Sequence, residues 1–245
     1  MRKLRLAWGT MGYSDTGGVG TPLVLLHGTG CDSADWDGVV DRLPPGLRVI
    51  RMDFRGHGRS DAGAEPLSLD DLSEDVLAAA GRLGLEEAIL VGHSLGGMVA
   101  MDVARRSSLA IALVLLEGWT RSAASEAFAG DRTFGALDGP AVREIERKLS
   151  ETVARFAPEA WKRLEESGAR FDALGYLEAS RIPIAEVYGD KGRTNSTRRG
   201  LMIPDKPNIE VIWIPGAGHY LPHERPADVA TIIAETAGRA QPPSS

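Results

Sequence analysis

The stretch Gly92-His93-Ser94-Leu95-Gly96 places one serine between two glycines, directly after an apolar run and directly before a helical pattern. This Gly-x-Ser-x-Gly spacing is typical of a nucleophile elbow, a sharp strand-to-helix turn that exposes a serine hydroxyl. The serine at the apex takes a strained backbone conformation, and the glycines let the strand and the helix pass without Cβ clashes. Ser94 is therefore the candidate nucleophile.

Backbone N–H groups near this turn could stabilise a developing oxyanion. Leu95 follows Ser94 in the first turn of the expected helix, where its N–H has no partner within the helix and lies at the positive end of the helix dipole. The earlier stretch LLHGTG ends an expected strand in a His-Gly-x-Gly pattern. It should present a second N–H, with Thr29 as the candidate donor and Gly28 as the alternative. His27 is interpreted as a structural residue of this turn.

Short apolar runs alternate with longer helical patterns along most of the chain, which indicates an α/β fold with a parallel sheet and crossover helices. Because the runs are apolar almost throughout, both faces of the sheet should be buried. Residues 4–8 and 12–15 could form an antiparallel pair that leads into it. The expected strands are 23–27, 47–53, 88–92, 111–116, 182–189 and 209–214, and the expected helices are about 69–83, 95–106 and 227–236.

The alternation stops after residue 117, where apolar residues recur at helical spacing from Val142 to Phe156 without an intervening strand. We interpret residues 118–180 as an inserted helical cap, and residues 1–117 and 181–245 as the core. This cap segment holds half of the chain's aromatic residues, which could wall an apolar pocket or only attach the cap to the sheet. The candidates for substrate contact are Trp119, Phe128 and Phe134.

Composition narrows the class of partner. The 28 Lys and Arg residues against 34 Asp and Glu give a net charge of −6, which argues against nucleic acid or an anionic membrane. A small substrate with little charge fits better. The single cysteine, Cys31, cannot form an internal disulfide, and no spacing typical of a zinc or redox site occurs. Neither a signal peptide nor a membrane-spanning run is evident, so we expect a soluble, cytoplasmic protein of undetermined oligomeric state.

Four motifs occur in an informative order, namely LLHGTG, MDFRGHGRSD, VGHSLGGM and GAGHYLPHERP. With them the chain resembles the α/β-hydrolase superfamily over nearly its full length. The resemblance implies the α/β-hydrolase fold, with a mostly parallel central sheet, flanking helices and a short helical cap. It also implies that the loop carrying Asp53, Arg55 and His57 is structural.

A serine near neutral pH needs a base within hydrogen-bond reach, held in turn by a third group. Turns account for three of the five histidines, which leaves His219 and His223 after the last expected strand. In the superfamily the base is the histidine after Gly-x-Gly, so the resemblance assigns this role to His219. We expect His223 to cap or pair locally near Glu224.

The acid has two candidates. Most members of the superfamily carry an aspartate three positions beyond the glycine that ends residues 182–189, but this chain has Gly192 there, and Asp190 lies one step past the strand. A minority carries the acid after the preceding strand, where this chain has Glu117. A buried carboxylate there would be costly unless paired, and a histidine that becomes positive during turnover is a suitable partner. Glu117 is our candidate, with Asp190 as the alternative; Glu117 could also merely anchor the cap through backbone N–H groups.

A serine at the elbow implies acyl transfer, since alkyl-halide and epoxide chemistry in this superfamily uses an aspartate nucleophile. We expect hydrolysis of a carboxylic ester or lactone of a small to medium substrate through an acyl-enzyme, with no metal and no organic cofactor. Relatives also hydrolyse thioesters, cleave carbon–carbon bonds or perform cofactor-free perhydrolysis. Others keep the triad and act as small-molecule receptors or signalling proteins with little turnover. These alternatives stay open from the sequence.

Overall fold

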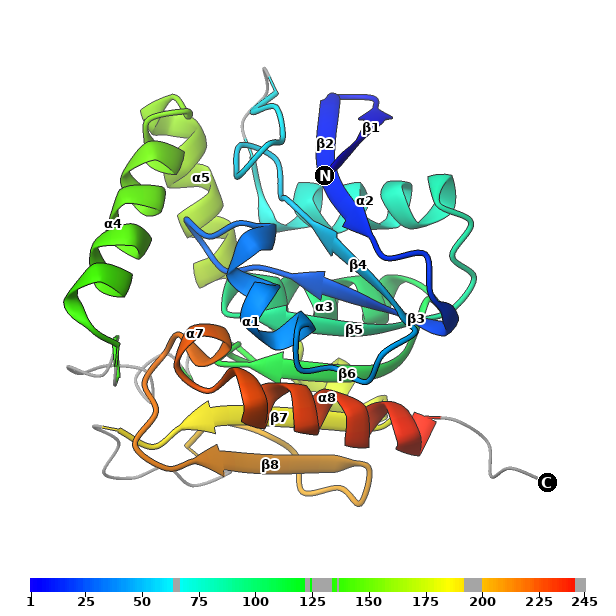
Figure 1. Cartoon of the computed structure of the whole chain (residues 1–245). Helices are drawn as coiled ribbons and strands as arrows, with labels where there is room; N and C mark the ends of the chain where they lie inside the picture. The colour runs from blue at the N-terminus through cyan, green and yellow to red at the C-terminus, as the bar shows by residue number, and fades with distance from the viewer. Residues whose placement is uncertain (64–66, 122–123, 125–133, 136, 192–199, 241–245) are drawn as a thin grey trace.

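A single mixed sheet forms the centre of the molecule (Figure 1). The computed structural model describes residues 1–63, 67–121, 124, 134–135, 137–191 and 200–240. Within these ranges eight strands pair in the order β1-β2-β4-β3-β5-β6-β7-β8. The strands are β1 (Arg2–Leu6), β2 (Gly9–Asp15), β3 (Val19–Leu26), β4 (Leu47–Met52), β5 (Ala88–His93), β6 (Ala110–Leu116), β7 (Ile184–Gly189) and β8 (Ile209–Ile214).

Pairing from β4 to β8 is parallel throughout, whereas β1 and β2 are antiparallel to each other and β2 is antiparallel to β4. The predicted α/β fold is therefore confirmed. The first hairpin begins two residues earlier than expected, because Leu6 pairs with Gly9. Trp8 consequently lies in the turn and not in the strand.

Helices cover both faces of the sheet, as buried apolar strands require. In Figure 1, α1 and α8 lie in front of the sheet, and α2 and α3 lie behind it. Alternate residues of β3 enter different layers: Leu23 and Leu25 pack with α1 and α8, while Val24 and Leu26 pack with α2 and α3. The helices of the core are η1 (Ser33–Trp36, a 3-10 turn), α1 (Asp37–Val40), α2 (Leu69–Arg82), α3 (Leu95–Arg106), α7 (Leu221–Glu224) and α8 (Pro226–Ala240).

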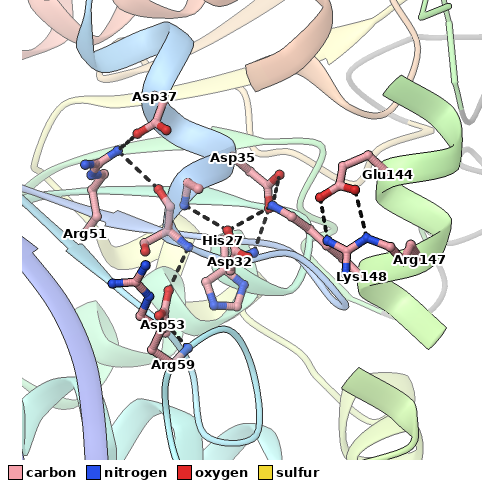
Figure 2. Close-up of polar contacts among 12 residues, drawn as sticks. His27, Asp32, Asp35, Asp37, Arg51, Asp53, Arg59, Glu144, Arg147 and Lys148 are labelled. Atoms are coloured by element: carbon pink, nitrogen blue, oxygen red, sulfur yellow. Dashed lines mark hydrogen bonds and ion pairs between the residues drawn. The ribbon is translucent and has the colours of Figure 1, made fainter. Parts of the chain in front are cut away.

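The described part of the cap segment contains the helices α4 (Gly139–Val153), α5 (Pro158–Ala169) and α6 (Leu174–Ala179). In Figure 1, α4 and α5 lie beyond the carboxyl ends of the parallel strands. Lys148 of α4 reaches the core with its Nζ 2.9 Å from a carboxylate oxygen of both Asp32 and Asp35 (Figure 2). Within the described ranges, none of the helices is both long and apolar enough to span a membrane.

Candidate active site

Ser94 occupies a tight turn between β5 and α3 with φ 52° and ψ −117°. A Cβ atom on Gly92 would lie 2.2 Å from the Gly96 oxygen, and one on Gly96 would lie 2.2 Å from the Leu26 oxygen. Both positions thus require glycine. A non-glycine residue at such a φ typically costs about 1–3 kcal/mol and is found most often at functional sites. The structure therefore has the geometry that the Gly-x-Ser-x-Gly spacing predicts.

Glu117 and His219 come together at this end of the sheet. Glu117 directly follows β6, is 1% exposed and has φ 56°. One carboxylate oxygen accepts the N–H of Gly189 at 2.7 Å, and the other lies 3.4 Å from Nδ1 of His219. The carboxylate therefore contacts the imidazole, and its contact with the Gly189 N–H is to the end of β7 in the core and not to the cap segment. A buried carboxylate beside Nδ1 would orient the ring and stabilise its positive charge.

Asp190 lies in a different setting, although it comes only one residue after the end of β7. Its side chain is exposed, and Oδ1 accepts the N–H of Gly216 at 2.6 Å. Gly216 has φ +69°, a conformation that favours glycine. The hydrogen bond from Gly216 to Asp190 stabilises this turn. The structure gives Asp190 a backbone contact in this turn and brings Glu117, not Asp190, to His219.

Three hydrogen bonds hold the backbone around His219. Burial and the neighbouring His219 lower the pKa of His93 to about 3, so the His93 ring is neutral near pH 7. Its Nε2–H donates to the His219 carbonyl at 2.8 Å. The two oxygens of Glu224 accept the N–H groups of Gly218 at 2.7 Å and Tyr220 at 3.0 Å. Because His93 directly precedes Ser94, its hydrogen bond joins the His219 loop to the elbow, with the His93 and His219 ring centroids 5.0 Å apart.

The expected pairing of His223 near Glu224 is not what the structure shows. Nε2 of His223 lies 2.8 Å from Oδ1 of Asp35, which also accepts from Lys148. Burial alone would raise the pKa of Asp35, but these two partners lower it below its usual value. Sequence proximity suggested the wrong partner, because Glu224 already uses its carboxylate on the backbone flanking His219.

The loop after β3 is oriented by His27. The Phe54 N–H donates to Nε2 of His27 at 2.9 Å, which places the proton on Nδ1, and Nδ1–H donates to the Gly28 carbonyl at 2.8 Å. The same carbonyl accepts the Cys31 N–H at 3.1 Å. In a trans peptide the N–H points opposite to the C=O, so the Thr29 N–H points away from these partners. Thr29 also lines the cavity beside Ser94.

The histidine-containing loop after β4 has structural contacts. The carboxylate of Asp53 accepts the N–H groups of Ser33 at 2.7 Å and Arg59 at 2.9 Å (Figure 2). Arg55 forms a two-pronged ion pair with buried Asp75, at 2.7 and 3.0 Å. These contacts fix the loop against η1 and α2.

A cavity of about 290 Å³ opens at Ser94. Core residues Thr29, Ser94, Leu95 and Glu117 line one side, and Trp119 and one face of α5 line the other. Of the aromatic residues predicted to contact substrate, Trp119 lines this cavity. Phe134 instead stacks on Tyr220 with ring centroids 5.6 Å apart, and Phe128 lies outside the described residues.

Sequence reasoning counted Trp161 among the aromatic residues that could wall a pocket, but it missed the rest of the contribution of α5. The residues it presents to the cavity are Trp161, Leu164, Glu165, Gly168 and Ala169. Their spacing of three and four residues is that of one helical face, and this signal was available in the sequence. The sequence did not indicate that this face lies over Ser94. The spacing determines which side chains share a face of the helix, but not which part of the protein that face contacts.

Comparison with known proteins agrees with this architecture. Residues 23–232 match the model of the Alpha/beta hydrolase family. The chain is 32% identical over 236 residues to the dihydrolipoyllysine-residue acetyltransferase component of the acetoin cleaving system of Pseudomonas putida, covering 84% of this chain and 60% of that protein. It is 35% identical over 166 residues to a pimeloyl-[acyl-carrier protein] methyl ester esterase of Pectobacterium atrosepticum, covering 66% of this chain and 60% of that protein.

This chain therefore spans about 60% of the length of these two curated relatives. Among solved structures, Est816, described as an N-acyl homoserine lactone degrading enzyme, is similar with a TM-score of 0.73 and 25% identity, covering 96% of this chain and 99% of that one. The match of the family model over most of the chain is the decisive finding. This chain belongs to the alpha/beta hydrolase family.

Proposed function

We propose that the protein is a serine hydrolase that cleaves carboxylic esters or lactones of small to medium substrates through an acyl-enzyme. The observation that carries the proposal is that Ser94, in its strained turn, shares one cavity with Glu117, whose carboxylate faces the imidazole of His219. The names of the relatives support the reaction class, since one is a methyl ester esterase and another degrades an acyl lactone.

The geometry supports a division of roles. With Nδ1 of His219 facing Glu117, its Nε2 is the atom available to the serine. His219 takes the proton of Ser94 as Oγ attacks the substrate carbonyl, and the oxyanion rests on the N–H groups of Leu95 and Thr29. The imidazolium then protonates the leaving alcohol. Water, activated by the same imidazole, attacks the acyl-enzyme and releases the acid.

The size and lining of the cavity favour a compact substrate. Pockets for small ligands typically have volumes of about 300–1,000 Å³, and about 290 Å³ lies just below this range. The lining is largely apolar, with Leu95, Met98, Trp119 and Leu164 among the residues. We therefore expect short acyl chains and small lactones to be hydrolysed better than long-chain fats.

The experiment is hydrolysis of p-nitrophenyl acetate and p-nitrophenyl butyrate by the wild-type protein and by Ser94→Ala. We expect multiple turnovers, reduced by about 10⁴-fold or more in the variant, and labelling of Ser94 by a fluorophosphonate. At most one equivalent of nitrophenol, together with a ligand-dependent shift in melting temperature, would instead indicate a receptor. A panel of esters, lactones and thioesters ranked by kcat/KM then identifies the bond.

A further inference from the structure

Helix α5 forms the side of the cavity opposite the elbow. A Cβ atom on its Gly168 would lie 3.6 Å from Cε of Met98, a residue of the first turns of α3. Helix α5 therefore packs close to α3, the helix that follows Ser94. The remaining residues of this face are Trp161, Leu164, Glu165 and Ala169, so an incoming substrate meets α5 directly.

One charged residue interrupts this face. Glu165 lies on the face where apolar residues are expected, and its Oε1 accepts the indole N–H of Trp161 at 3.0 Å. The next residue, Glu166, has the same charge but does not line the cavity; it lies 3.7 Å from both Lys162 and Arg170. The Trp161 contact thus holds the carboxylate of Glu165 at the cavity, whereas that of Glu166 faces cationic neighbours.

The charged residues at this cavity are of one sign. Within the described ranges, its lining includes Glu117 and Glu165 but no lysine and no arginine. Glu117 has His219 beside it, so Glu165 is the charge that the outer part of a substrate would meet. A carboxylate on that part of the substrate would be repelled, and an ammonium group would be attracted.

We propose that Glu165 is a specificity-determining residue that makes this site select uncharged or cationic esters and reject anionic ones. This inference rests on the proposed ester hydrolysis and adds the substrate class to it. The contact with Trp161 fixes where the charge lies, and the exposure of Glu165 limits the size of the effect. For an exposed pair of charges the effect on kcat/KM is about two- to fivefold per charge.

The test uses three methyl esters with acyl chains of six carbons: methyl hexanoate, monomethyl adipate and methyl 6-aminohexanoate. We expect kcat/KM of the wild-type protein at pH 7 to be about fivefold or more higher for the amino ester than for the adipate. Glu165→Gln, whose amide oxygen can still accept from Trp161, should reduce this ratio by about fourfold or more, because the ratio compares a cation with an anion and so contains the effect per charge twice. Raising the NaCl concentration should also reduce the ratio, because salt screens exposed charges.

Glu166→Gln is the matched control, since it removes the same charge one residue away, and it should leave the ratio unchanged. Equal kcat/KM for the anionic and cationic esters in the wild-type protein would overturn the inference, as would an equal change of the ratio in both variants. In either case, Ser94-dependent hydrolysis of methyl hexanoate would leave the proposed function standing. Absence of any Ser94-dependent hydrolysis of these esters and of the p-nitrophenyl esters would overturn both.

Discussion

Two carboxylates follow adjacent strands at the same end of the sheet, and their surroundings differ. Glu117 after β6 is 1% exposed, has a positive φ and faces the His219 imidazole. Asp190 after β7 is exposed and accepts a backbone N–H of the turn before His219. A carboxylate removed from water is costly unless it has partners, whereas an exposed one in a turn is not. Burial and hydrogen-bond partners, and not the distance along the chain from the strand end, distinguish the two carboxylates.

Neutralising each carboxylate in turn tests this difference directly. Glu117→Gln should lower kcat/KM by about 10³- to 10⁴-fold, because an amide can donate to Nδ1 and so favour the wrong tautomer of His219. Asp190→Asn should stay within about threefold of the wild-type protein, since its amide oxygen can still accept from Gly216. Both variants are measured with p-nitrophenyl acetate at pH 7.

The reverse result, with Asp190→Asn losing activity by orders of magnitude and Glu117→Gln nearly unchanged, would show that Asp190 is the acid. It would also leave the contact between Glu117 and Gly189 as the main role of the glutamate. Circular dichroism and melting temperature of both variants check that neither has simply failed to fold.

Glu224 supports the backbone of His219, the proposed base. Glu224 accepts two N–H groups with separate oxygens, one on each side of His219. A glutamine there offers one acceptor and turns a donor toward the other N–H. We therefore expect Glu224→Gln to lower kcat by about 100-fold with little change in KM, since misplacing a catalytic group by about 1 Å can have this effect.

Asp228→Asn is the matched control for Glu224, because it removes an exposed carboxylate of the neighbouring helix α8 that pairs with Arg225 at 3.5 Å. It should leave kcat unchanged. A rise in KM with kcat preserved in Glu224→Gln would contradict a positioning role. A comparable loss in both variants would mean that general charge, and not the contact with the His219 loop, causes the effect.

The sequence predicted the parts of this site that depend on local pattern. The Gly-x-Ser-x-Gly turn and the apolar strands follow from steric and burial rules that act over a few residues. The role of Glu224 could not be predicted in the same way, because its hydrogen bonds depend on how the loop folds back after β8. His223 was assigned the wrong partner for a related reason: Asp35 is 188 positions away along the chain, and only the tertiary fold brings η1 beside α7.

The contrast between buried and exposed groups extends to the histidines and predicts how stability depends on pH. Burial lowers the pKa of His93 to about 3 from an ordinary value of 6.5, so the unfolded chain binds a proton below pH 6.5 that the folded protein does not. The contribution of His93 to the free energy of unfolding is fully present above pH 6.5 and decreases as the pH falls. At pH 5 this contribution has decreased by about 2 kcal/mol. Urea unfolding at pH 7 and pH 5 measures this loss of stability.

His93→Gln should show a decrease in the free energy of unfolding between these pH values that is smaller by about 2 kcal/mol. The control Val19→Gln, at an exposed position, should match the wild-type protein. An undiminished decrease in His93→Gln would mean that His93 takes up a proton in the folded state as readily as in the unfolded chain, and the lowered pKa of His93 would then be wrong.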